Sequence, residues 1–154
     1  MKSKTAFFAY PEANPLVRDA IRGATGIELG SGLKIKPWEE MNILGFKLDS
    51  LVRDSIQDAD FLAADITIPN HNVFYEVGYA LSLGKPVLPT VNTAIRSASD
   101  AVRRVGLFDT TGYAGYSNAE ELAAHLDSWS AQAWQNRVSD KRDFAQPLFV
   151  LDTL

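Results

Sequence analysis

The sequence lacks several of the residues on which common kinds of site chemistry depend. It contains no cysteine, which excludes disulfide bonds, thiolate metal ligands and a cysteine nucleophile. Its two histidines, His71 and His125, are too far apart for the spacing of a zinc site. No stretch approaches the roughly 20 apolar residues of a transmembrane helix, and no signal peptide follows the charged start. We therefore expect a cytoplasmic protein with no metal, no cofactor and no membrane contact.

Basic residues are in the minority. The 15 lysines and arginines are outnumbered by 19 acidic residues, for a net charge of −4. We therefore expect no direct nucleic-acid binding, which needs a basic surface. A chain of 154 residues, 46% of them hydrophobic, suits one globular domain. We place this domain at residues 1–140 and interpret residues 141–154 as a C-terminal extension or the start of a region that continues past Leu154.

Short apolar runs alternate with amphipathic helical patterns, which is typical of a parallel sheet covered by helices. We expect strands at Thr5 to Tyr10, Leu33 to Trp38, Phe61 to Ile66, Val87 to Val91 and Gly106 to Thr110. We expect helices from Pro15 to about Gly23, Phe46 to Gln57, Asn72 to about Leu83, Ser99 to Arg104 and Ser117 to about Trp134. The predicted fold class is α/β: a flavodoxin-like, doubly wound, mostly parallel five-stranded sheet in a single domain.

Two glycine-containing segments are expected to be loops. Residues 23–32 lack both the Gly-Lys-Ser/Thr ending and the glycine spacing of phosphate-binding loops, so we interpret them as a connection. Residues 112–116 are expected to be flexible. Immediately after them, Ser117 and Glu120 have the spacing of a capping box at the start of a helix.

The most informative stretch runs from Asp60 to Thr90 and has the pattern of strand, polar loop, helix, glycine stop and strand. We expect Asn72 to cap the helix and Gly84 to end it. Glu76 then lies in the first helical turn, beside the carboxyl end of a parallel strand, where open sheets bind ligands. A helix N-terminus also favours a carboxylate by up to about 1 kcal/mol. The residues alone therefore leave two interpretations for Glu76, a functional carboxylate or a residue that complements the helix dipole.

Four short motifs stand out in this stretch: Asp65-Ile66, Asn70-His-Asn-Val73, Tyr75-Glu76-Val-Gly78-Tyr-Ala80 and Gly84-Lys85-Pro86-Val87. Together they resemble the core of the nucleoside 2-deoxyribosyltransferase superfamily and its TIR-like relatives. The resemblance implies that Glu76 is the catalytic carboxylate. It also implies that Asp65 is a second catalytic acid, which protonates or orients a leaving base; its plainer interpretation is a turn residue at the end of a strand.

In a flavodoxin-like order the first and central strands are neighbours, and their carboxyl ends gather the remaining candidates. We expect the substrate-binding residues to be Ala9, Tyr10, Pro11, Trp38, Asn70 and Asn72, with Glu39 beside them. Tyr10 either orients Glu76 by a hydrogen bond or packs. Asn72 either contacts a ribose or only caps its helix. Trp38 either covers a base or is an ordinary half-buried tryptophan.

Cleavage of an N-glycosidic bond suits this set of residues, because a carboxylate stabilises or attacks the oxocarbenium-like transition state. The resemblance implies two enzymatic branches. The loop Pro69-Asn-His-Asn72 lacks the Asp-Ser/Gly-Gly-Thr type of sequence found in the transferases. This favours hydrolysis of NAD, as substrate, or of a related nucleotide by a TIR-like domain, such as the effector domain of a bacterial antiviral defence protein.

Two alternatives to this hydrolase stay open. The first is a nucleoside 2-deoxyribosyltransferase, which passes the sugar to another base. The second is a non-catalytic module that binds a nucleotide signal or a partner protein in the same crevice. In each case we expect a small-molecule nucleotide or nucleoside as ligand. We also expect a homo-oligomer, because the resemblance implies a site that is completed by a neighbouring protomer.

Overall fold

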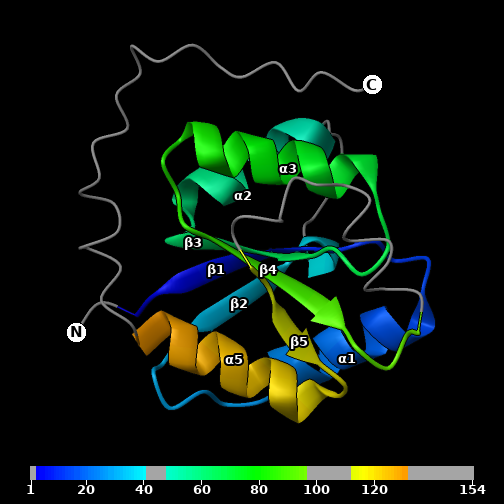
Figure 1. Ribbon diagram of the computed structural model, residues 1–154. Coiled ribbons are helices and arrows are strands. Elements are labelled where there is room, and N and C mark those ends of the chain that lie inside the picture. The colour runs from blue at the N-terminus through cyan, green and yellow to red at the C-terminus, as the bar shows by residue number, and fades with distance from the viewer. Residues whose placement is uncertain (1–2, 41–47, 97–111, 132–154) are drawn as a thin grey trace.

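The computed structural model describes residues 3–40, 48–96 and 112–131. Within them, five strands form one sheet: β1 (Thr5–Ala9), β2 (Lys34–Pro37), β3 (Phe61–Asp65), β4 (Val87–Asn92) and β5 (Ala114–Tyr116). The strand order is β2-β1-β3-β4-β5, and every pairing is parallel (Figure 1). This is the flavodoxin-like, doubly wound α/β order that the sequence predicts.

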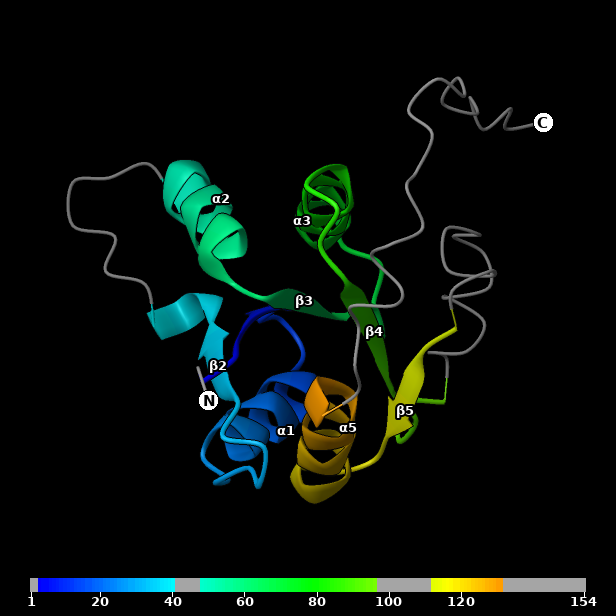
Figure 2. The ribbon, with the colours of Figure 1, turned by 90° about the vertical axis from the view of Figure 1, so that its left-hand side faces the viewer.

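Helices cover both faces of this sheet. Their bounds are α1 (Pro15–Thr25), α2 (Leu48–Asp58), α3 (His71–Ser82) and α5 (Ala119–Ala131), with a short 3₁₀ helix η1 (Trp38–Glu40) after β2. Figure 2 shows α1 and α5 on one face and α2 and α3 on the other. No helix in these described ranges combines the length and apolar character needed to cross a membrane.

The central strand β3 joins two apolar cores. All five of its residues are buried. Phe61 and Ala63 face the core under α1 and α5, whereas Leu62 and Ala64 face the core under α2 and α3. Because successive side chains of a strand alternate between faces, a strand covered on both sides is expected to be apolar, and only the last residue of β3, Asp65, departs from this. This explains why the continuous apolar run correctly predicts a buried strand.

The edge strand β5 corrects one prediction. Residues 112–116 are predicted to be flexible, whereas β5 runs through them and Tyr116 is fully buried. β5 pairs with β4 only from Thr90 onwards. The Thr90 carbonyl accepts the Ile66 N–H and therefore points away from β5. Because the backbone groups of successive strand residues point to opposite sides, those of Pro89 face β5, and proline has no N–H to donate there. β5 is therefore short, and three residues leave too little alternation to recognise.

Helix α3 begins two residues earlier than the sequence predicts. Its N-cap is Asn70, not Asn72, and the Asn70 Oδ1 accepts the backbone N–H groups two and three residues on, at 2.9 and 3.2 Å. Nothing in His71 opposes helical geometry, so the helix extends back to the cap that follows Pro69. Glu76 therefore lies in the second turn. Because the helix dipole acts mainly on the first turn, it does not account for this carboxylate.

The other end of α3 agrees with the prediction. Gly84 has a φ of +69°, a conformation that only glycine adopts without strain. Its N–H donates to Leu81 O, and the N–H of Lys85 donates to Ala80 O, both at 3.0 Å. This pair of bonds is a Schellman motif. The Lys85 ammonium also donates to Gln57 O near the end of α2, at 2.6 Å, and so ties the two helices to the start of β4.

Helix α5 is capped one residue later than predicted. The Asn118 Oδ1 accepts the Glu121 N–H at 2.9 Å, and the Asn118 carbonyl accepts the first helical bond from Leu122. The Glu121 carboxylate reaches back to the N–H and hydroxyl of Ser117, at 2.7 and 2.9 Å. Asn118 therefore caps the helix in place of Ser117, and Glu121, in place of Glu120, accepts from the residue before the cap.

Residues 23–32 form the end of α1 and the connection to β2, as predicted. Four further predictions fall outside the described residues: the short helix at 99–104, the strand at 106–110, the end of the last helix near Trp134 and the tail at 141–154.

Candidate active site

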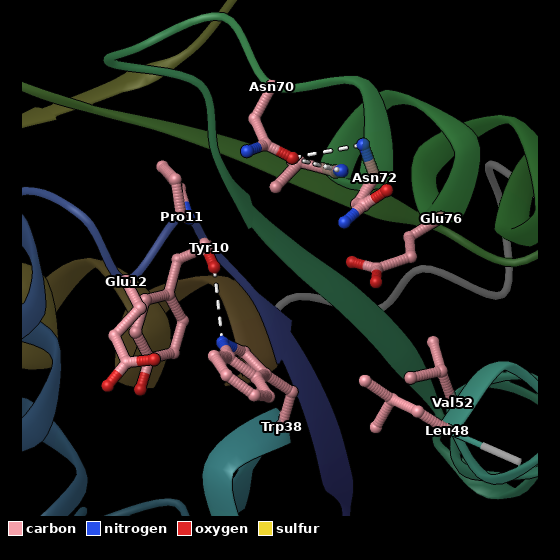
Figure 3. A pocket seen from close by; sticks show the side chains of 10 residues that line it. Tyr10, Pro11, Glu12, Trp38, Leu48, Val52, Asn70, Asn72 and Glu76 are labelled. Carbon is pink, nitrogen blue, oxygen red and sulfur yellow. Dashed lines mark hydrogen bonds between the residues drawn. The ribbon is translucent and has the colours of Figure 1, made fainter.

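A pocket of about 160 Å³ opens where β1 and β3 end (Figure 3). After β1 the chain crosses to β2 on one side, and after β3 it crosses to β4 on the other. Such a switch point leaves a crevice at the carboxyl ends of the strands. The lining residues come from the loop after β1, from η1, and from the starts of α2 and α3: Tyr10, Pro11, Glu12, Trp38, Leu48, Val52, Asn70, Asn72, Val73 and Glu76.

Six of the eight predicted site residues line this pocket: Tyr10, Pro11, Trp38, Asn70, Asn72 and Glu76. The other two do not. Ala9 is the last residue of β1 and is wholly inside the core beneath α2 and α3. Asp65 is the last residue of β3, and its side chain is also inaccessible to solvent. The structure therefore brings together one acidic candidate, Glu76, with amide and aromatic groups.

Glu76 is the central polar group of the pocket. Figure 3 shows its carboxylate projecting from α3 into the space between Asn72, Trp38 and Leu48. The side chain is half-buried. Burial raises the pKa of Glu76 to about 7, from 4.5, and among the described residues no charged neighbour contributes to this shift. The carboxylate therefore changes between its neutral and ionised forms near neutral pH.

Two aromatic rings form one wall of the pocket. The Trp38 indole N–H donates to the Tyr10 carbonyl at 3.1 Å, and the two ring centroids are 6.2 Å apart at 55°. The Tyr10 hydroxyl is buried and has no hydrogen-bond partner among the described residues. Burial and the nearby Glu39 carboxylate raise its pKa above the ordinary value. Of the two interpretations, the structure thus favours packing of Tyr10 over a hydrogen bond to Glu76.

The corrected start of α3 changes the roles of its two asparagines. Asn70 Oδ1 is fully used in capping the helix. The Asn72 side chain is not the cap, and Figure 3 shows its carboxamide pointing towards the same space as the Glu76 carboxylate. Asn72 can therefore donate to or accept from a ligand hydroxyl, whereas Asn70 mainly holds the helix end in place.

Glu39 was expected beside the site but does not line the pocket. Its Oε2 instead forms an ion pair with the Arg22 guanidinium, with distances of 2.6 Å to Nη2 and 2.8 Å to Nε. This pair fastens η1, and with it the aromatic wall, to α1. A partly exposed pair of this kind contributes little stability by itself, but it fixes a geometry.

Sequence reasoning missed four lining residues: Glu12, Leu48, Val52 and Val73. Glu12 could have been predicted from the sequence, because it directly follows Tyr10 and Pro11 in the loop after β1. Leu48 is 40% exposed and contributes an apolar side chain to the pocket. Among the described lining residues the two glutamates are the only charged ones, and none is a lysine or arginine. No described group of three or more potential ligand side chains could hold a metal ion.

Asp65 lies in a separate polar cluster at the carboxyl ends of β3, β4 and β5. The Tyr116 hydroxyl donates to Asp65 Oδ2 at 2.7 Å, and the Thr67 N–H donates to Oδ1 at 3.1 Å. The Thr90 hydroxyl lies 3.4 Å from Oδ2. Burial raises the pKa of Asp65 to about 6, although these hydrogen bonds act in the opposite direction.

The sequence matches no protein-family profile and no curated protein. Among solved structures, the chain resembles the CMP N-glycosidase BcmB of Clostridium botulinum, with 18% sequence identity and a TM-score of 0.49. The match covers 82% of this chain and 99% of that chain. An identity this low does not define a substrate, so the chemistry must be inferred from the pocket itself.

Proposed function

We propose that this protein hydrolyses the N-glycosidic bond of a nucleotide, with NAD as the first candidate substrate. The observation that carries the proposal is the Glu76 carboxylate, which is desolvated by burial and projects into a pocket with one amide neighbour and an aromatic wall. No described residue supplies a cationic partner for Glu76, and a carboxylate without such a partner is poorly stabilised when ionised. The positive charge that develops on the sugar during glycosidic cleavage supplies the missing partner.

The reaction needs only the groups present and water. The bond between the anomeric carbon and the base nitrogen breaks, and its electron pair leaves with the base. Ionised Glu76 stabilises the oxocarbenium ion or bonds to it, and water then adds to the anomeric carbon and loses a proton. In this proposal the Asn72 carboxamide binds a ribose hydroxyl next to that carbon.

The charges of the pocket support NAD over other nucleotides. The nicotinamide ring of NAD is a cation, and it leaves as a neutral base without taking a proton. This fits a pocket in which Asp65, the expected second acid, does not take part. A cationic ring is also attracted by the faces of Tyr10 and Trp38 and by the Glu76 carboxylate. Phosphate groups meet no lysine or arginine in the described lining and therefore have to extend outwards.

The experiment that tests the proposal is product analysis by chromatography. The protein is incubated with NAD, nucleoside monophosphates and deoxynucleosides, with and without an excess of a competing free base. We expect free nicotinamide from NAD without any acceptor. Glu76→Gln should reduce the rate at least about a hundredfold with the fold intact, whereas Glu12→Gln, which removes a charge from the exposed rim of the same pocket, should retain most of the activity.

Each of the other outcomes has a definite meaning. Formation of a new nucleoside only when a base is added would replace hydrolysis with 2-deoxyribosyl transfer. Binding of a nucleotide without release of any base would identify the pocket as a sensor. Unchanged turnover in Glu76→Gln would remove Glu76 from the mechanism.

A further inference from the structure

The buried carboxylate of Asp65 has no place in the mechanism above, although its surroundings are specifically built around it. Asp65 is 0% exposed and does not line the pocket. Its strongest donor is the hydroxyl of Tyr116, itself 0% exposed, at 2.7 Å. Burying a carboxylate away from water costs free energy unless protein groups donate hydrogen bonds to it. Here the donors come from β5, from the loop after β3 and from β4.

The cluster continues along the loop that leads to α3. Asp65 Oδ1 accepts the Thr67 N–H and fixes the first turn of that loop. The Thr67 hydroxyl in turn accepts the Asn92 N–H at 2.7 Å, which fastens the loop to the end of β4. Three residues after Thr67 the chain reaches Asn70, whose side chain caps α3. Hydrogen bonds thus hold the path from Asp65 to the helix that carries Glu76.

β5 is fastened to the same point. The Tyr116 carbonyl accepts the N–H of Thr93 at 2.7 Å and the Thr93 hydroxyl at 3.1 Å. Tyr116 therefore connects two segments: its backbone carbonyl bonds to the turn after β4, and its hydroxyl bonds to Asp65 at the end of β3. A three-residue edge strand has few ladder bonds of its own, so this side chain is a substantial part of what positions it.

We propose that Asp65 and Tyr116 are positioning residues: they act through the loop after β3 to hold α3, and therefore Glu76, in register with the aromatic wall of the pocket. This rests on the proposed function of Glu76. It replaces the expectation that Asp65 is a second catalytic acid. Acid chemistry at Asp65 would need contact with the substrate, and its side chain has no exposed surface through which to make it.

Three variants separate a positioning role from a catalytic one. Tyr116→Phe removes only the hydroxyl that donates to Asp65. Asp65→Asn keeps the size and can keep both bonds, because its Oδ1 accepts the Thr67 N–H and its Nδ2 donates to the Tyr116 hydroxyl, which can act as acceptor. Asp65→Ala leaves both partners without an acceptor. Tyr113→Phe is the matched control, because it removes the hydroxyl of an exposed tyrosine on the same segment.

Steady-state kinetics of base release are measured well below each variant's melting temperature. We expect kcat to fall about tenfold or more in Tyr116→Phe and in Asp65→Ala, because small displacements of a catalytic group are costly. Asp65→Asn should stay near wild type, as should Tyr113→Phe. If Asp65→Asn is as inactive as Glu76→Gln while Tyr116→Phe is normal, Asp65 is a catalytic acid and the proposal is wrong. If the variants melt earlier but keep the wild-type kcat, the cluster only stabilises the fold, and the proposal is again wrong.

A second measurement does not depend on turnover. The Asn70 side chain accepts the backbone N–H groups of Asn72 and Val73, so hydrogen exchange at these amides reports how well the start of α3 is held. We expect faster exchange there in Tyr116→Phe than in Asp65→Asn or Tyr113→Phe. If the wild-type protein cleaves no glycoside, the proposed function fails, yet this exchange experiment still decides the positioning role. Equal exchange in all three variants would overturn it.

Discussion

Replacing Glu76 with glutamine should change the stability of the protein in a way that depends on pH and needs no knowledge of the substrate. Burial raises the pKa of the Glu76 carboxyl from 4.5 to about 7. The folded protein therefore holds this proton more tightly than the unfolded chain does. The stabilisation linked to the proton is complete below pH 4.5 and is lost as the pH rises towards 7 and beyond.

The size of the effect follows from the same values. A difference of one pKa unit between the folded and unfolded states corresponds to about 1.4 kcal/mol. Ionised Glu76 therefore lowers the free energy of unfolding at pH 8 by up to about 3 kcal/mol. Glutamine has a similar shape and does not ionise. We expect Glu76→Gln to be more stable than wild type by up to this amount at pH 8, and to be equal to it near pH 4.

Urea denaturation of both proteins, followed by circular dichroism from about pH 4 to pH 8, measures this difference. The buried Asp65 titrates in both proteins, so its contribution cancels. Glu12→Gln is the control for net charge, since it removes a carboxylate from the exposed rim of the pocket. A Glu76→Gln difference that stays constant across this range would refute the claim that burial in the pocket destabilises the ionised form.

Three other predictions follow from the same geometry, and a fourth follows from the family resemblance. The rate of base release should rise with pH and level off above about pH 7, because Glu76 must be ionised; a flat pH–rate profile would contradict this. Asn70→Ala should lower the free energy of unfolding by about 1 kcal/mol in urea melts, whereas Asn72→Ala, at a residue that does not cap the helix, should cost much less. Gly84→Ala should cost about 1 kcal/mol in the same assay, because alanine is strained at a φ of +69°. We also propose that the protein works as a homo-oligomer, so that specific activity should rise with protein concentration; light scattering that shows only monomer at full activity would exclude this.

The central part of the fold could be predicted because its signals are local. A continuous apolar run from Phe61 indicated a strand buried on both faces, and Gly84 marked the one position where the helix could end in a left-handed conformation. Once these elements were placed, the rule that ligands bind at the carboxyl ends of parallel strands was sufficient to group Tyr10, Trp38 and Glu76.

The errors arose where long-range contacts decide the structure. β5 has only three residues and forms by pairing with β4 and by burying Tyr116, which no local pattern indicates. Asn70 and Asn72 are equally good caps on sequence grounds, and the choice between them moved Glu76 by half a turn. The catalytic role expected for Asp65 stays a prediction: its place at a strand end is confirmed, but the sequence could not show that the hydroxyl of Tyr116, 51 positions away, would donate to its carboxylate.

The two sides of the pocket belong to two consecutive pieces of the chain. Residues 3–40 supply the aromatic wall, and residues 48–96 supply the carboxylate and the amides. The pieces meet through the pairing of β1 with β3, so neither can hold the ligand alone. Chains divided between positions 40 and 48 should therefore bind the ligand only as a reassembled pair, and the ligand should tighten that assembly. In the intact protein the ligand should oppose complete unfolding rather than local opening. At a ligand concentration of a hundred times its Kd, it should raise the free energy of unfolding by about 2.7 kcal/mol.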